Sequence, residues 1–132
     1  MLIREESKVF RISDTEKYLK VEFQGQMDYP TITRAINATM DRPDYPHRND
    51  IWVLEGSDLT LQFENLAQIT EMIKGRYPVN ATRTKTALVA SPGFNASIAE
   101  LWIESAQALP QEIKMFSGLK PAEDWVNESP VA

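Results

Sequence analysis

Apolar and polar residues alternate along two short segments near the start of the chain. In residues 18–24 every second residue is apolar, which is the pattern of a β-strand with one buried side. A similar segment at residues 9–13 precedes it, and the turn-forming residues 14–17 separate the two. A connection of four residues is short enough for an antiparallel hairpin. The chain is therefore predicted to open with a β-hairpin.

Helical and strand patterns then alternate to the end of the chain. Pro30 suits a first helical turn, Asp28 suits an N-cap, and apolar residues follow at helical spacing up to Met40. Further helices are predicted at about residues 62–76, 95–109 and 121–127. Apolar runs between the helices predict strands at residues 51–54, 86–90 and 113–116.

This order predicts an α/β fold: a single, mainly parallel sheet with an N-terminal β-hairpin and sequential β-α units joined by right-handed crossovers. A length of 132 residues is that of one domain, and no linker divides it. We therefore expect one domain over residues 1–132, with its core at about residues 9–126. Because the strands at 18–24 and 113–116 have a polar side, the helices are expected mainly on one face. The other face would then be partly open or covered by another subunit.

The composition excludes several kinds of chemistry. The chain has no cysteine and a single histidine, His47, so thiolate and multi-histidine metal sites are excluded, and no metal or cofactor is expected. A net charge of -5 argues against nucleic-acid binding, which needs a basic face. No apolar run approaches the roughly 20 residues that cross a bilayer, and the first residues lack the apolar core of a signal peptide. We therefore expect no transmembrane segment and a cytoplasmic location.

Three loops follow predicted parallel strands, at the edge where ligands usually collect in such sheets. They comprise residues 55–60, 91–95 and 117–120. In the second loop, Gly93 permits a close approach to the backbone, and hydroxyl and amide groups lie near a helix start, which suits a small anion. The alternative is that Asn95 caps the helix and Gly93 shapes the turn. The candidate ligand- or partner-binding residues are Glu55, Ser57, Asp58, Thr60, Ser91, Gly93, Asn95 and Ser97.

Two carboxylates of the first loop, Glu55 and Asp58, are in principle capable of acid/base catalysis. The sequence offers them no nucleophile, metal-ligand set or defined partner. Solvated carboxylates or a helix cap are therefore the favoured interpretation. No catalytic residue is assigned, and the chain is not expected to be an enzyme.

The predicted helix at residues 95–109 is apolar over a wide arc, because Trp102 lies between Leu101 and Ile103. Such a surplus of apolar residues indicates a dimer contact or a groove for a hydrophobic ligand, and a buried position in the core is the alternative. Trp102 is therefore the candidate interface residue.

Basic residues gather at the end of the predicted sheet opposite the three loops. This polarity could orient an acidic partner or a lipid headgroup. Ordinary solubilising charge and favourable cations at a helix C-terminus explain it equally well. His47, in a nearby proline-rich loop, is interpreted as an exposed residue. The basic residues are Arg42, Arg48, Lys74, Arg76, Arg83 and Lys85.

Three stretches of sequence carry a resemblance to a known family. They read Asp-Ile-Trp-Val-Leu-Glu at 50–55, Lys-Thr-Ala-Leu-Val-Ala at 85–90, and Ile-Lys-Met-Phe at 113–116 followed by Pro-Ala-Glu-Asp-Trp-Val at 121–126. With the element order, they resemble the SpoIIAA-like fold of STAS domains, modules of anti-anti-sigma factors and sulfate transporters. They are most similar to a bacterial branch of STAS or CRAL-TRIO-like domain proteins. The resemblance extends over about residues 9–126.

The resemblance also implies what to expect of phosphorylation. In phosphorylated STAS regulators, an Asp-Ser-Ser/Thr-Gly motif follows the strand that corresponds to residues 51–54. Here residues 55–64 read Glu-Gly-Ser-Asp-Leu-Thr-Leu-Gln-Phe-Glu, without that motif. Partner switching through a phosphorylated serine is therefore not implied for this chain.

Two functions are expected from the fold and the resemblance. The first is a non-catalytic intracellular regulatory or protein-interaction module, acting on a protein partner or as a homo-oligomer, with Ser57, Thr60 and nearby loops as the recognition edge. The alternative is a binder, carrier or sensor of a small apolar, amphipathic or anionic ligand, as the resemblance to CRAL-TRIO-like carriers implies. A carrier needs an apolar pocket between helices and sheet, on the order of a few hundred Å³. An association module needs only a solid core and an exposed apolar patch.

Overall fold

A mixed five-stranded sheet forms the centre of the protein in the computed structural model, which describes residues 10–43, 47–77 and 83–128. The strand order is β1-β2-β4-β6-β7. The predicted hairpin is confirmed, since β1 (Phe10–Asp14) is antiparallel to β2 (Tyr18–Phe23). The remaining strands, β4 (Asn49–Val53), β6 (Thr84–Val89) and β7 (Gln111–Phe116), run parallel to β2. The prediction of a mainly parallel sheet thus holds for four strands, and the hairpin makes the whole sheet mixed.

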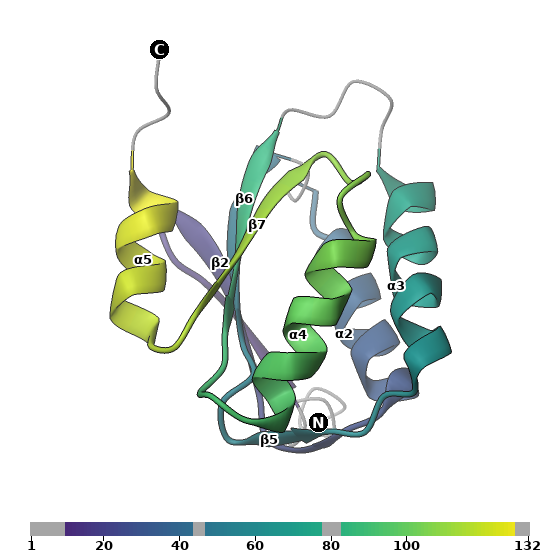
Figure 1. The fold of residues 1–132 in the computed structure, drawn as a ribbon. Helices are drawn as coiled ribbons and strands as arrows, with labels where there is room; N and C mark the ends of the chain where they lie inside the picture. Colours follow the sequence, from purple (N-terminus) through teal and green to yellow (C-terminus); the bar gives the residue numbers. More distant parts are fainter. Residues whose placement is uncertain (1–9, 44–46, 78–82, 129–132) are drawn as a thin grey trace, which may run out of the picture.

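Among the described residues, three helices cover one face of this sheet and a fourth lies on the other (Figure 1). The three are α2 (Tyr29–Met40), α3 (Phe63–Arg76) and α4 (Phe94–Ser105). The fourth, α5 (Leu119–Asn127), packs against β4, β6 and β7. Most helices are on one face, as expected. The second face, however, is covered in part by the chain's own last helix, which the sequence interpretation did not place there.

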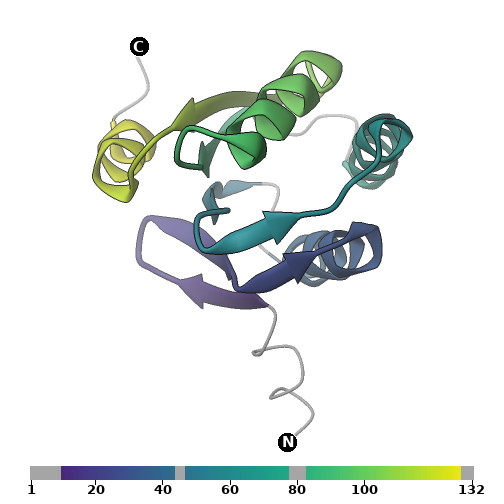
Figure 2. The ribbon, with the colours of Figure 1, turned by 60° about the horizontal axis from the view of Figure 1, so that its bottom comes forward.

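Two further strands form a small separate sheet that the sequence interpretation missed. β3 (Gly25–Met27) and β5 (Ser57–Leu59) pair in parallel, just beyond the carboxyl ends of β2 and β4 (Figure 2). Each has three residues, too few to show a period of two. Gly25 and Gly56 turn the chain before them with φ of +82° and +84°, a conformation that favours glycine.

The starts of α2 and α4 show which helix cap could be predicted from the sequence and which could not. Asp28 caps α2 as predicted, since its Oδ1 accepts the backbone N–H of Thr31 at 3.0 Å. The interpretation of Asn95 as the cap of α4 is wrong. Gly93 is the N-cap, with φ of +142°, and Asn95 lies inside the first turn. Its amide is engaged elsewhere, as described below.

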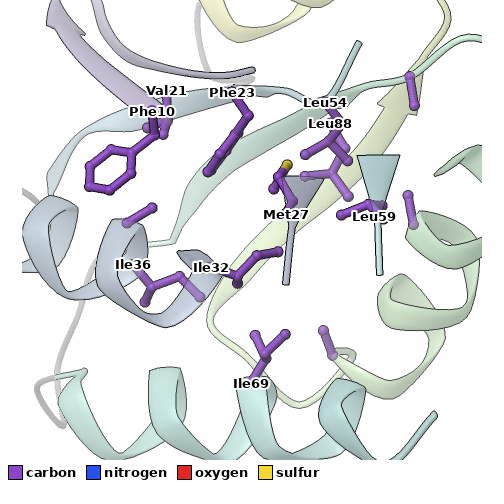
Figure 3. Close-up of a cluster of buried hydrophobic side chains, with 14 of the residues drawn as sticks. Phe10, Val21, Phe23, Met27, Ile32, Ile36, Leu54, Leu59, Ile69 and Leu88 are labelled. Carbon is purple, nitrogen blue, oxygen red and sulfur yellow. The ribbon is translucent and has the colours of Figure 1, made fainter. Parts of the chain in front are cut away.

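The larger part of the hydrophobic core lies between the sheet and α2, α3 and α4. Ile32 and Ile36 of α2 and Ile69 of α3 point toward the sheet, where they face Leu54 and Leu88 (Figure 3). Ile32 and Ile36 are four residues apart, which places them on one side of α2. No helix in the described part of the chain is long and apolar enough to pass through a bilayer.

A second, smaller cluster lies under α5. Trp125 is its centre and packs on Phe116, with 5.6 Å between the ring centroids. The ammonium groups of Lys85 and Lys114 each lie 5.2 Å from the Trp125 ring centroid. The strands thus bury side chains on both faces where α5 covers them.

Candidate functional site

An apolar cavity of about 80 Å³ lies between the helix layer and the central sheet. The strands, the small sheet and the following loop contribute Met27, Trp52, Leu54, Leu59, Leu61 and Leu88. The helices contribute Ile32, Ile36, Leu66, Ile69, Ile73, Ile98, Ala99 and Trp102. Because isoleucine and leucine dominate this lining, the cavity favours apolar ligand atoms.

Three polar side chains line this cavity from the amino-terminal ends of neighbouring strands: Asp50 of β4, Thr86 of β6 and Gln111 of β7. Asp50 and Thr86 are paired in register. All three are buried, and Asp50 is only 1% exposed. The sequence analysis did not single out any of them.

A chain of hydrogen bonds holds the Asp50 carboxylate. Thr86 Oγ1 donates to Asp50 Oδ1 at 2.6 Å, and Trp52 Nε1 donates to Asp50 Oδ2 at 2.7 Å. Gln111 Nε2 in turn donates to Thr86 Oγ1 at 2.8 Å. Each carboxylate oxygen therefore accepts a hydrogen bond from a neutral donor, which fixes the orientation of Asp50 at the cavity wall.

Burial raises the pKa of Asp50 from 3.8 to about 6, because the carboxylate is removed from water. The hydrogen bonds from Thr86 and Trp52 act in the opposite direction and limit the rise. No salt bridge to Asp50 is found within residues 10–43, 47–77 and 83–128. Above pH 6 the cavity wall therefore carries a negative charge that only neutral donors stabilise.

Trp102, the candidate interface residue, is half-buried and lines the cavity. Its Nε1 is buried, and no hydrogen-bond partner for it occurs in the part of the chain that the structure describes. On the same helix, Leu101 is exposed to 42% and Phe94 to 65%. The outward apolar surface of α4 is thus formed by these two residues, while Trp102 packs against the core.

The first two predicted loops meet at the carboxyl edge of the sheet. Asn95 joins them: its Nδ2 donates to the carbonyls of Ser57 at 2.7 Å and Leu54 at 3.3 Å, and its Oδ1 accepts the Leu59 N–H at 3.2 Å. Ser91 Oγ donates to Glu55 Oε2. The third loop does not join them, because residues 117–120 lead into α5 on the other face.

Most of the predicted loop hydroxyls bond to nearby groups of the protein. Ser57 is buried, and its Oγ donates to the Leu54 carbonyl at 2.6 Å. Ser97 Oγ donates to the Gly93 carbonyl at 3.2 Å. Asp58 and Thr60 are exposed. The two loops therefore form a hydrogen-bonded edge in which polar side chains hold the backbone.

The predicted basic end is largely paired with acidic or carbonyl groups. Arg42 and Arg48 each place Nη2 3.0 Å from a carboxylate oxygen of Asp14, and together they lower the Asp14 pKa. Arg76 Nη2 lies 2.5 Å from Asp41 Oδ1, and Lys85 Nζ donates to the Trp125 carbonyl at 2.9 Å. His47 is exposed, as interpreted. In the described residues no group of three or more histidine, aspartate or glutamate side chains is placed to hold a metal ion.

The layered sheet, its antiparallel edge hairpin and the sequential β-α units define an α/β protein with a SpoIIAA-like fold. The fold is shared with an uncharacterised protein of the DUF3478 family from Shewanella loihica PV-4, whose crystal structure is described as SpoIIAA-like. The two match with a TM-score of 0.54 at 15% identity, over 89% of this chain and 92% of that chain. No family model and no curated protein matches the sequence. At this identity the likeness shows the fold alone.

Proposed function

We propose that the protein is a non-catalytic binding module that takes up a small apolar molecule between its helix layer and its central sheet. The supporting observation is the cavity of about 80 Å³, lined almost throughout by leucine, isoleucine and tryptophan. A well-packed domain has few voids larger than a water molecule. A cavity of this size, at the centre of the larger core, is therefore a candidate ligand site.

The volume limits the size of the ligand. An apolar cavity of about 150 Å³ takes up benzene in a well-studied case. The present cavity fits a smaller molecule, or one of that size once a lining side chain moves. Met27, which is fully buried and lines the cavity, is suited to such an adjustment because methionine is unbranched and flexible.

Neighbouring residues of β6 offer a matched pair of variants for testing this function. Leu88 lines the cavity, whereas Val89 is buried in the cluster under α5. We expect Leu88→Ala to enlarge the cavity and to tighten benzene binding relative to the unaltered protein. Val89→Ala should leave benzene binding unchanged. Methyl NMR shifts of Ile69, with Ile51 of the other cluster as an internal control, measure the binding.

Both variants lose a buried side chain, so both are expected to lose stability, with about 2–5 kcal/mol for the leucine. Comparing benzene binding to the two variants therefore distinguishes the effect of a larger cavity from the effect of a less stable core. If benzene and smaller apolar molecules shift no cavity methyl in the unaltered protein or in Leu88→Ala, the proposed function is wrong.

Association with a protein partner or a second copy is the second candidate function. Three large apolar side chains are exposed in the part of the chain that the structure describes: Phe63 to 77%, Phe94 to 65% and Leu101 to 42%. Phe63 and Phe94 are the first residues of α3 and α4, which pack side by side. Large apolar side chains that are exposed to solvent are a common feature of interaction surfaces.

A further inference from the structure

The cavity contains a charged group that an apolar ligand alone would not need. Asp50 is only 1% exposed and lines a space whose other walls, apart from Thr86 and Gln111, are apolar side chains. It is the one titratable side chain among the described residues that line this cavity. Burying a carboxylate is costly unless it is paired with a positive charge.

The surroundings of Asp50 fit an ionised carboxylate. Trp52 Nε1 is only a donor, so Asp50 Oδ2 must accept from it. Thr86 Oγ1 accepts a hydrogen bond from Gln111 Nε2 and donates its own hydrogen bond to Asp50 Oδ1. The hydrogen bonds thus run toward the carboxylate from both sides. Donors arranged in this way stabilise the negative form without neutralising its charge.

We propose that the ligand is a small aliphatic amine, whose ammonium group pairs with Asp50 while its hydrocarbon part fills the cavity. This inference rests on the cavity being the ligand site proposed above. The positive charge that the protein's own described residues do not bring to Asp50 would come from the ligand. Asp50 would then be the residue that decides which apolar molecules are bound.

Other ligand classes fit the cavity less well. A carboxylate or phosphate would be repelled by Asp50 at close range in a medium of low dielectric constant. A pure hydrocarbon would leave the buried charge without a partner. An alcohol can donate one hydrogen bond to Asp50 but brings no charge, and hydrogen bonds that involve a charged group on both sides are the stronger ones.

Two ligands of equal size distinguish these classes: n-butylamine and n-butanol. Each is titrated into ¹⁵N-labelled protein at pH 7.5, where Asp50 is ionised. The indole N–H of Trp52 reports on the Asp50 carboxylate, and that of Trp125, in the cluster under α5, is the internal control. We expect n-butylamine to bind at least about tenfold more tightly than n-butanol, because it adds a charged hydrogen bond. The Trp52 signal should shift and the Trp125 signal should not.

Two variants then test whether the preference for n-butylamine over n-butanol depends on the Asp50 side chain. Asp50→Asn is expected to lose the preference for the amine while still binding n-butanol. Glu64→Gln, which removes an exposed carboxylate in the first turn of α3, is the matched control and should keep the preference. If Asp50→Asn does not fold, comparing the binding of n-butylamine and n-butanol to the unaltered protein still tests whether the ligand is an amine.

The outcomes separate the two proposals. Equal binding of both ligands, or tighter binding of n-butanol, would overturn the amine and leave the apolar site in place. The amine is also ruled out if Asp50→Asn keeps the preference. If neither ligand shifts the Trp52 signal, and benzene gives no shift of the cavity methyls, the ligand site itself is ruled out.

Discussion

Asp50 makes the stability of the protein depend on pH in a defined direction. Its pKa is about 6 in the folded protein, against an ordinary value of 3.8. Between these values the folded state binds more protons than the unfolded state, so the free energy of unfolding falls as pH rises. The difference of about two pKa units corresponds to roughly 3 kcal/mol, lost between pH 4 and pH 6–7.

Replacing the carboxyl by an amide should remove this dependence. We expect the stability of Asp50→Asn, relative to the unaltered protein, to increase by up to about 3 kcal/mol between pH 4 and pH 7. Urea unfolding at several pH values measures it. Asp14 and Asp28 have lowered pKa values and act at lower pH, and their effect is the same in both proteins. A difference in stability that stays constant across this range would contradict the assignment.

For single residues, contacts between neighbours in the sequence could be predicted, whereas contacts between residues far apart in the sequence could not. Asp28 could be predicted as a cap because its partner, Thr31, is three residues away. Asp50 stands at the edge of an apolar run, one residue before the predicted strand at 51–54. Its partner Thr86 is 36 residues away, and only the pairing of β4 with β6 brings them together. An aspartate beside a core strand is the signal that could have marked the site.

Among the elements, α4 and β5 are joined by the side chain of Asn95. Asn95 makes three hydrogen bonds to the backbone of residues 54–59. Its amide therefore fixes the start of α4 against the small sheet. This is a structural role at the position where the sequence indicated a helix cap or an anion contact.

Removing that amide should loosen this edge of the protein. We expect Asn95→Ala to lower the free energy of unfolding by about 2 kcal/mol, since the Leu59 N–H and two carbonyls lose a half-buried partner. Ser97→Ala, on the same helix, removes one exposed hydrogen bond and should change stability by less than about 0.5 kcal/mol. Urea unfolding compares the two variants. Equal losses would show that Asn95 has no special part in joining α4 to β5.

Element boundaries were predicted best where the apolar pattern coincides with the element. The strand expected at residues 86–90 begins at Thr84, because polar residues at its start pair in the sheet all the same. The helix expected at 95–109 ends at Ser105, and Leu109 is buried in the turn that follows. An apolar residue that is buried in a turn, such as Leu109, thus fits the same apolar spacing as a residue of the helix. The periodicity of the sequence alone therefore does not show where the helix ends.

For the whole molecule, the sequence predicted the parallel β-α order but not the position of α5. Its apolar side, Ala122, Trp125 and Val126, was recognised as helical. The pattern does not state which face of the sheet it covers. That depends on the direction in which the chain leaves β7, which no local period encodes. The sequence also places the apolar surplus at Trp102, whereas the large exposed apolar side chains include Phe63 and Phe94.

These two phenylalanines give the second candidate function its test. If they form a contact between copies, the unaltered protein should show a monomer–dimer equilibrium in sedimentation. Phe63→Ser combined with Phe94→Ser should shift it to monomer without a large change in melting temperature, because both side chains are mostly exposed. Lys120→Ser, an exposed change in the first turn of α5, is the control and should leave association unchanged. If the unaltered protein is a monomer at all concentrations, self-association through Phe63 and Phe94 is ruled out.

The small β3–β5 sheet has a mechanical consequence. β3 leads into α2 and β5 into α3, and Asn95 fastens α4 to β5, so the amino-terminal ends of all three helices share one anchor. At their far ends, α2 and α3 are joined through Arg76 by exposed contacts, which contribute little. We therefore expect the helix layer to separate from the sheet more readily at the carboxyl-terminal ends of these helices, beside Asp50, than at their anchored amino-terminal ends.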